Sequence, residues 1–459
     1  MMNRLALVPS RARWLLVGAP LVLSLAACGG GGGGSGPGPT TYTIGGTLSG
    51  LLAGQQITLI DNGNDPLTLK ANGSFTFAKR VAPKGSYAVT IGTQPTLQTC
   101  SISKGSGSGV TANVTSVAVS CTNGNLYSSS FGAGGGVWQY AINPTSGALA
   151  PLSPASVPAG SGNGGIALDK TGRYLYVPSQ GNSAIYQFSR GVGGALTPLP
   201  RASLPGQVVS PTSLTVSADG KYLYATNTSS TVGNVGVFGI DPNGQISPAG
   251  SGIASIGNPI NPIVASPTGP YLYGAVYAGR LGQNTIGANG DPIPMSPASV
   301  LVPTTQANRI AIAPNGKSVY IGSTLNGTIS QLALGANGLG SLLSPSSVTA
   351  GTAVNGMAID PGSNYLYVSG SHFVYQYNIS NNGELVPMDP ASVPVAAASV
   401  PASSLTGIQV DPTGRYVYVS ADQPTSQTYG FSIGANGTLT PLSAAPVPAG
   451  TSSVSMAVR

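Results

Sequence analysis

The sequence has very few of the residues that most enzymes use for acid–base chemistry and metal binding. Among its 459 residues there is one histidine, His372, and one glutamate, Glu384. A metal site with several histidines is therefore excluded, and so is a catalytic pair of glutamates. Any Ser-His-Asp arrangement would have to use His372. Since nucleotide-binding loops, haem motifs and metal-ligand clusters are also missing, we expect neither a cofactor nor a metal.

Charge is scarce as well. Charged residues make up 6% of the chain, against roughly 25% in an ordinary soluble domain. The net charge of +7 includes three arginines within the first 27 residues, and no basic run occurs after them. Nucleic-acid binding needs a concentrated basic stripe, so we exclude it. The 67 glycines and 38 prolines are spread along the chain, which favours an all-β protein of short strands and tight turns.

The first 27 residues are typical of an export signal. Arg4, Arg11 and Arg13 precede an apolar run over residues 14–25, which is too short for a comfortable membrane span. The sequence Leu-Ala-Ala-Cys ending at Cys28 resembles the lipobox of bacterial lipoproteins. That resemblance implies cleavage before Cys28, acylation of its thiol and anchoring of the chain to a membrane. The alternative is an ordinary signal peptide followed by an unmodified cysteine.

Residues 28–40 form a Gly/Ser/Pro tether, since the glycine run after Cys28 has neither a preceding strand nor a following Lys-Ser or Lys-Thr. We therefore expect an exported protein, lipid-anchored in the bacterial cell envelope. By resemblance to Gram-negative lipoproteins, the glycine after Cys28 is compatible with sorting to the outer membrane.

Residues 41–122 predict a small β-sandwich, immunoglobulin-like or transthyretin-like. Five alternating segments at 41–44, 56–60, 67–69, 74–77 and 87–91 are separated by turn-forming sequences. Cys100 and Cys121 are the remaining cysteines, and in an oxidising compartment we expect a disulfide between them, with a reactive thiol pair as the alternative. The stretch from Asp61 to Asp65 also resembles a calcium loop weakly.

The rest of the chain, residues 123–459, repeats one unit seven times. A tyrosine in a short apolar motif recurs at spacings of 49, 48, 49, 47, 47 and 51 residues. It stands at Tyr127, Tyr176, Tyr224, Tyr273, Tyr320, Tyr367 and Tyr418. Because the tyrosines share the period of the unit, we interpret them as core packing rather than as a platform for sugars.

Each unit predicts four antiparallel strands, which is one blade of a β-propeller. The fourth segment contains proline, as in Leu196-Thr197-Pro198-Leu199, so it should form the outer edge. Asp169, Asp219, Asp360 and Asp411 recur in the turn after the first strand and should be turn formers. The first unit lacks a first strand, and residues 454–458 match it. We therefore predict a seven-bladed propeller closed by the C-terminal strand.

The Gly-Arg-Tyr-Leu-Tyr-Val motif over residues 172–177, with its counterpart at 414–419, resembles the seven-bladed lactonase family. That family includes bacterial 6-phosphogluconolactonases and muconate-cyclising enzymes, and also non-enzymatic surface proteins. The resemblance covers residues 122–459 and implies the propeller fold. It also implies chemistry by Arg, His and Glu around the mouth of the central channel. The single glutamate, Glu384, falls in a hairpin on the outer half of its blade, away from that mouth.

Five residues fall in loops that face the channel mouth in propellers. His372, Arg280, Asp422 and Gln423 follow second strands, and Arg309 directly precedes a first strand, where other blades carry glycine or serine. Arg280 and Arg309 could hold a carboxylate or an oxyanion, with His372 as general base on water. The alternative is that each is an ordinary exposed loop residue.

Three functions remain open. The first is a lipid-anchored envelope protein whose propeller binds a small molecule or an envelope protein without chemistry. The second is a hydrolase acting on a non-phosphorylated lactone, because a phosphorylated cytoplasmic sugar lactone does not suit an exported protein. The third is a structural adhesin or assembly scaffold. A channel mouth lined by apolar residues or by Ser and Gly would favour binding, whereas His372 within reach of either arginine would favour catalysis.

Overall fold

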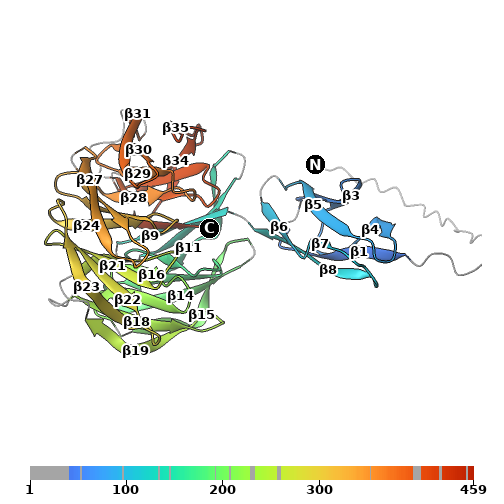
Figure 1. Ribbon diagram of the computed structural model, residues 1–459, viewed down its shortest axis with the longest axis horizontal. Coiled ribbons are helices and arrows are strands. Elements are labelled where there is room, and N and C mark those ends of the chain that lie inside the picture. Colours follow the sequence, from blue (N-terminus) through green and yellow to red (C-terminus); the bar gives the residue numbers. More distant parts are fainter. Residues whose placement is uncertain are drawn as a thin grey trace, which may run out of the picture.

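The computed structural model describes most of the chain from Thr41 onward. Cys28 and Gln423 lie outside the described residues, which are 41–51, 54–95, 98–122, 124–132, 135–143, 146–191, 193–205, 208–227, 233–255, 260–351, 353–395, 405–422, 426–450 and 453–459. Every regular element in these ranges is a β-strand, and none of them contains a helix that could cross a membrane. Figure 1 shows two bodies, a small β domain and a larger propeller, joined between β8 and β9.

The small domain consists of two four-stranded sheets around one apolar core. In the first sheet the order is β4 (Gly73–Val81), β1 (Tyr42–Ser49), β8 (Val114–Thr122) and β6 (Thr99–Ser103). In the second it is β3 (Asp65–Leu69), β2 (Ile57–Asp61), β5 (Tyr87–Thr93) and β7 (Ser106–Gly107). Ile44 and Val117 of the first sheet share a core cluster with Ile57 and Leu59 of the second. The predicted sandwich is therefore present, with β6 to β8 added to the expected strands.

The two aspartates of the predicted calcium loop face the protein. Asp61 Oδ1 accepts a hydrogen bond from the Ala88 amide at 3.0 Å, and Asp65 Oδ2 accepts one from the Lys79 amide at 2.8 Å. Both carboxylates are buried. They stabilise the β2–β3 hairpin, which explains the pattern without a metal ion.

The propeller consists of seven sheets of antiparallel strands, as the repeat predicts. From the channel outward, blade 1 consists of β37 (Ser453–Val458), β9 (Gly124–Ser130), β10 (Gly136–Ile142) and β11 (Leu149–Pro158), and blade 2 of β12 (Ala167–Leu168), β13 (Tyr174–Ser179), β14 (Ala184–Arg190) and β15 (Leu196–Pro205). Blade 3 consists of β16 (Leu214–Val216), β17 (Tyr222–Asn227), β18 (Asn234–Ile240) and β19 (Ile246–Ser255). Blade 4 consists of β20 (Ile260–Ala265), β21 (Tyr271–Val276), β22 (Arg280–Ile286) and β23 (Pro292–Leu301).

In the same order, blade 5 consists of β24 (Ala307–Ile312), β25 (Ser318–Ser323), β26 (Thr328–Leu334) and β27 (Gly340–Thr349). Blade 6 consists of β28 (Gly356–Ile359), β29 (Tyr365–Ser369), β30 (Phe373–Ile379) and β31 (Leu385–Pro394). Blade 7 consists of β32 (Leu405–Val410), β33 (Tyr416–Ala421) and β34 (Gln427–Ile433), with β35 (Leu439–Pro441) and β36 (Val447–Pro448) outside β34. The strands that carry proline are the outermost, because an edge tolerates a residue that cannot donate to the ladder. Each of the seven blade interfaces has its own apolar cluster.

The C-terminal strand completes blade 1. β37 pairs antiparallel with β9, so that Ser453 lies opposite Ser130 and Val458 opposite Leu126. The backbones of Asn125 and Arg459 also bond to each other in both directions, at 2.8 and 3.0 Å. The ring is thus closed by hydrogen bonds between the two ends of the propeller sequence.

Carboxylates shape several of the turns between first and second strands. Asp169, Asp360 and Asp411 each accept a hydrogen bond at 2.6–2.7 Å from the backbone amide that opens the second strand. In blade 3 the hydroxyl of Ser217 takes this place, and Asp219 lies two residues later, where it accepts a bond from that hydroxyl. Asp219 is therefore a turn former, as predicted, but it acts from a different position of the turn than the other three.

The seven repeated tyrosines form a complete ring of hydrogen bonds between blades. Each is at most 1% exposed, and each hydroxyl donates, at 2.5–2.8 Å, to a glycine carbonyl in the outer turn of the next blade. The acceptors are Gly194, Gly244, Gly290, Gly338, Gly383, Gly437 and Gly147. All seven have φ between 70° and 93°, a conformation that favours glycine.

A second, incomplete ring is made by buried glutamines of the third strands. The amide nitrogens of Gln139, Gln187, Gln283, Gln331 and Gln376 donate to a carbonyl of the same blade's fourth strand. Their amide oxygens accept from the fourth strand of the next blade at 2.6–2.9 Å. Blade 3 has Val237 opposite Tyr224, where the glutamine would stand. The next blade begins its fourth strand with Pro292, which has no amide hydrogen to be satisfied.

Candidate functional site

The two faces of the propeller carry different loops. The hairpin face contains the hairpins between second and third strands together with the beginnings of the innermost strands. The turn face contains the turns between first and second and between third and fourth strands. Of the predicted site residues, Arg309, Arg280, His372 and Asp422 lie on the hairpin face. Glu384 closes the β30–β31 turn on the opposite face, so the single glutamate is remote from the channel mouth.

Arg309 occupies a position on β24 where the other innermost strands carry small residues. The counterparts are Gly165, Ser213, Pro262, Gly356, Gly407 and Ser455. At Gly356 an added Cβ would lie 2.8 Å from the carbonyl oxygen of Thr406 in the next blade, so neighbouring strands approach too closely for a large side chain. The side chain of Arg309 must therefore extend over the edge of the neighbouring strand at the mouth of the channel.

The contacts of Arg309 are backbone carbonyls. Its Nε donates to Asn355 O of blade 6 at 2.6 Å, and its Nη1 donates to Asn308 O at 2.7 Å. Arg309 is the only charged residue in the seven innermost strands. Within the described residues no carboxylate pairs with it. Burial lowers the pKa of its guanidinium, but an arginine stays protonated at neutral pH. The result is a half-buried cation without a counter-ion.

Asn355 connects Arg309 to the hairpin of His372. The backbone carbonyl of Asn355 accepts from Arg309, and its side-chain nitrogen donates to Gly370 O at 3.2 Å. Asn308 holds the neighbouring hairpin in the same way, through Thr324. These two asparagines were not predicted as site residues, because asparagine is a common turn residue.

The other candidates do not meet Arg309. His372 is exposed, and its carbonyl accepts from the Val395 amide. Arg280 Nε donates to Ser299 Oγ of the outermost strand at 2.9 Å, and Asp422 accepts from Ser426 Oγ at 3.4 Å. Over the described part of the chain, no hydrogen bond or ion pair joins any two of these four side chains. The geometry therefore assembles a cationic mouth, not a catalytic triad.

Asn163, just before the innermost strand of blade 2, is a polar residue that the sequence analysis missed. Its backbone pairs with Ser179 across the sheet. The side chain is fully buried, and neither its amide oxygen nor its amide nitrogen has a hydrogen-bond partner in the part of the chain that the structure describes. A buried amide without partners is costly. No sequence signal marks it, because its surroundings read as a glycine-rich loop.

Exposed apolar side chains lie at the tips of several hairpins on the same face. Phe131, Tyr277, Leu325 and Phe373 are 41–61% exposed, and the last three belong to blades 4, 5 and 6. These are Arg309's own blade and its two neighbours. The hairpin face therefore combines the half-buried cation of Arg309 with exposed apolar groups, which is typical of a binding surface.

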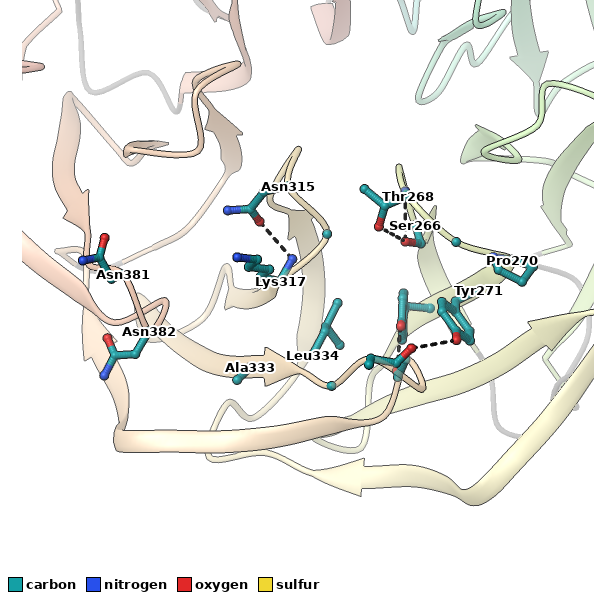
Figure 2. Close-up of a pocket in the computed structure, with 16 residues that line it drawn as sticks. Ser266, Thr268, Pro270, Tyr271, Asn315, Lys317, Ala333, Leu334, Asn381 and Asn382 are labelled. Atoms are coloured by element: carbon teal, nitrogen blue, oxygen red, sulfur yellow. Dashed lines mark hydrogen bonds between the residues drawn. The ribbon is translucent and has the colours of Figure 1, made fainter.

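A pocket of about 740 Å³ opens on the turn face between blades 4, 5 and 6. Figure 2 shows Asn315, Lys317, Asn381 and Asn382 on one side of the hollow and Tyr271 on the other. Tyr271 donates to Ala336 O at 3.3 Å, and the Lys317 amide donates to Asn315 Oδ1 at 2.9 Å. The lining side chains come from turns that build the blades, so the pocket follows from the scaffold. No group of three or more His, Cys, Asp or Glu residues suited to a metal occurs in the described ranges.

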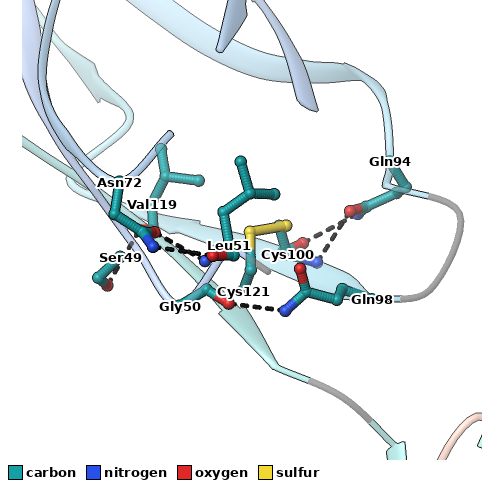
Figure 3. The surroundings of a disulfide bond; sticks show 9 residues. All are labelled: Ser49, Gly50, Leu51, Asn72, Gln94, Gln98, Cys100, Val119 and Cys121. Carbon is teal, nitrogen blue, oxygen red and sulfur yellow. Dashed lines mark hydrogen bonds between the residues drawn. A yellow bond between two sulfur atoms is a disulfide. The ribbon is translucent and has the colours of Figure 1, made fainter. Parts of the chain in front are cut away.

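Cys100 and Cys121 form the predicted disulfide. They lie directly opposite each other on β6 and β8, and both are buried. Figure 3 shows that amide side chains hold the surrounding loops: Gln98 donates to Gly50 O at 2.6 Å, and Gln94 bonds the backbone of Cys100 in both directions. The pair is enclosed by structure, which is the setting of a structural disulfide rather than a reactive one.

Comparisons with known proteins agree with this fold. The family described as "Lactonase, 7-bladed beta-propeller" matches residues 178–451. A putative 6-phosphogluconolactonase from Bacteroides fragilis is 17% identical, with a TM-score of 0.60 over 74% of this chain and 98% of that one. The periplasmic gluconolactonase of Pseudomonas aeruginosa is 16% identical, with a TM-score of 0.59 over 73% and 99%. A functionally unknown protein from Desulfotomaculum acetoxidans is 12% identical, with a TM-score of 0.56 over 73% and 99%. At these identities the likeness concerns the fold, and no curated protein matches the sequence.

Proposed function

The chain belongs to the family of seven-bladed β-propeller lactonases, and we propose that its propeller binds a small carboxylate and does not hydrolyse lactones. Arg309 is the contact for the negative charge. The observation that carries the proposal is the position of this side chain, which is the only charged group on the innermost strands and has two backbone carbonyls as its partners. A half-buried guanidinium held in this way is preorganised to receive an anion.

The apolar residues at the hairpin tips extend the proposed site. Tyr277, Leu325 and Phe373 flank the blade of Arg309 and are exposed. A ligand with a carboxylate at one end and an apolar body would bind both features. The glycine and serine residues around Arg309 also support binding, since they provide neither a general base nor a nucleophile with an adjacent base.

Lactone hydrolysis is the second candidate, and one observation favours it. Asn355 bonds both Arg309 and the hairpin that carries His372, so a ligand on Arg309 would lie near that hairpin. In this mechanism His372 would accept a proton from water, and Arg309 would stabilise the oxyanion formed at the lactone carbonyl. The remoteness of Glu384, on the turn face, argues against it.

The test measures binding and turnover on the same compounds. Calorimetric titration of the chain without residues 1–28 would compare sugar and aliphatic lactones with their open-chain hydroxy acids. We expect the carboxylates to bind more tightly, and Arg309→Gln to weaken them about 10- to 100-fold, which is the range for a hydrogen bond to a charged group. Arg280→Gln removes a charge from the same face and should change little.

A pH-stat assay then separates the two candidates. Turnover of a lactone that both His372→Ala and Arg309→Gln abolish would establish the hydrolase and displace the binding proposal. Equal loss of affinity in Arg309→Gln and Arg280→Gln would contradict a specific site at the channel mouth. Circular dichroism of each variant verifies that the propeller remains folded.

We also propose that the chain is exported and anchored to the cell envelope through an acylated Cys28. The lipobox-like sequence and the tether after it support this. Metabolic labelling with palmitate should label the wild-type protein and not Cys28→Ser. A labelled Cys28→Ser protein, or an unlabelled wild type in the membrane fraction, would overturn the anchor.

A further inference from the structure

The β-sandwich separates its charges completely between surface and interior. Residues 41–122 contain five cations, Lys70, Lys79, Arg80, Lys84 and Lys104, and all five are exposed. The same residues contain two acids, Asp61 and Asp65, and both are buried against backbone amides. The sandwich therefore presents a surface with positive charge and no exposed carboxylate.

Four of the five cations lie at one end of the sandwich. β1 begins opposite the end of β4, so that Tyr42 faces Val81 and Thr43 faces Arg80. Lys79 precedes Arg80, and its Nζ donates to Asn64 O. The Lys84 amide donates to Val110 O, and Tyr87 at the start of β5 donates to Lys104 O. We call this group, Lys79, Arg80, Lys84 and Lys104, the basic end.

The basic end is opposite the propeller. β8 runs parallel to β1 and leads directly into the propeller, so the beginning of β1 lies at the other end of the domain. Lys70 is the exception, because it adjoins Asn72, which bonds Leu51 beside the disulfide. The end at which the chain enters the sandwich is thus the end where the cations gather.

We propose that the basic end docks on the anionic phospholipid headgroups of a membrane. The argument is charge complementarity together with position, since the basic end surrounds the entry of the chain about a dozen residues after Cys28. A tether of that length has a mean reach of roughly 20 Å, which brings the cations to within a few Debye lengths of the surface. The proposal uses the anchor at Cys28 only to bring the two surfaces together.

The test uses the chain without residues 1–28, which keeps both folded domains and carries no acyl group, so that it is independent of the anchor. Co-sedimentation would compare vesicles of phosphatidylcholine with vesicles containing one third phosphatidylglycerol. We expect binding only to the anionic vesicles, weakened by salt. A basic residue near such a surface strengthens binding about fivefold, so Lys84→Asn with Lys104→Asn should weaken it about 30-fold.

Asparagine suits the backbone conformation of both lysines that are replaced. Lys84 and Lys104 have φ of 62° and 54°, a region that asparagine tolerates better than most residues. Lys70→Asn, at the other end of the sandwich, is the matched control and should retain binding. Loss in Lys70→Asn equal to that in the double variant, or no binding of the wild type to anionic vesicles, would overturn the proposal. Displacement by free inorganic phosphate at low millimolar concentration would also overturn it, since it would indicate a discrete anion site.

Discussion

The sandwich and the propeller solve the same problem, the closure of a β structure, by different means. The sandwich has one core cluster and a covalent link, the disulfide between β6 and β8. The propeller has seven small clusters, one for each interface, and no described disulfide within it. Its blades are instead joined by side chains that reach a carbonyl of the next blade. A small domain gains from constraining its unfolded chain, whereas a ring gains from repeating one interaction at every interface.

Their charges differ as well. The sandwich has five exposed cations against two buried acids, while the propeller has ten cations and nine acids. Most of the propeller's acids shape turns, as Asp169 and Asp411 do. The comparison indicates that the acids of the propeller mainly bind backbone amides in turns. The excess positive charge on the surface of the molecule comes mainly from the sandwich. Three measurements would break or sharpen this contrast.

Alkaline pH should produce the largest difference in stability between the two domains. Burial raises the pKa of all seven ring tyrosines above the ordinary value of 10.0, to about 12 for Tyr127 and Tyr320. As the pH rises above 10, the tyrosines of the unfolded chain therefore lose their protons before those of the folded protein. The free energy of unfolding, which is fully present below pH 10, then decreases. Each tyrosine contributes about 1.4 kcal/mol per pH unit. Seven give on the order of 10 kcal/mol per unit, which is comparable to the whole stability of a domain.

We expect the propeller to unfold cooperatively between pH 10 and about 12, with tyrosinate absorbance and the loss of near-ultraviolet circular dichroism coinciding. Tyrosines that ionise gradually in a protein that stays folded would contradict the proposed role of burial. The same titration in guanidinium chloride gives the unfolded reference.

Removal of the disulfide should destabilise the sandwich alone. Cys100→Ala with Cys121→Ala opens a loop defined by a sequence separation of 21 residues, which on the chain-entropy model costs about 3 kcal/mol. Urea unfolding followed by proteolysis within residues 41–122 measures the effect. The propeller transition is the internal control. Equal destabilisation of both transitions would show that the two domains unfold as one unit.

Loss of a single ring hydroxyl should have the smallest effect. Tyr367→Phe leaves the buried Gly437 carbonyl without its donor, for which we expect a loss of about 1–3 kcal/mol from the propeller. Tyr375→Phe is the matched control: this tyrosine lies opposite Val368 in the same blade, and its hydroxyl makes no hydrogen bond to any of the described residues. Thermal unfolding compares the two. Identical melting temperatures would mean that the ring is maintained by packing alone.

Much of the architecture could be predicted because the repeat appears seven times. The tyrosine motif, the prolines of outer strands and the unmatched segment at the C-terminus together indicate the blade count and its closure. In the sandwich there is no repeat to compare, and β6 to β8 were missed. Val117, Val119 and Cys121 do alternate as the buried face of β8, but this pattern was not used as a strand signal.

The interactions between blades could not be predicted, because they join residues that the sequence separates widely. Gln331 recurs at a fixed place in its unit, yet its role depends on the amide of Leu385 in the next blade. Arg309 was recognised as a candidate from its position, but its contact with Asn355 depends on how closely two strands approach. The side-chain amide of Asn163 has no hydrogen-bond partner among the described residues, so only its burial marks it.

The closing strand also determines the order in which the protein can be completed during synthesis. A chain that grows from its N-terminus has the whole sandwich, disulfide partners included, before the second blade exists. The first blade, in contrast, waits for Ser453–Val458, the last strand to be made. Until then its β9 edge is unpaired and the ring is open. The sandwich is therefore the part that can fold as it emerges, and the propeller is the part that closes only after Ser453–Val458 has been made.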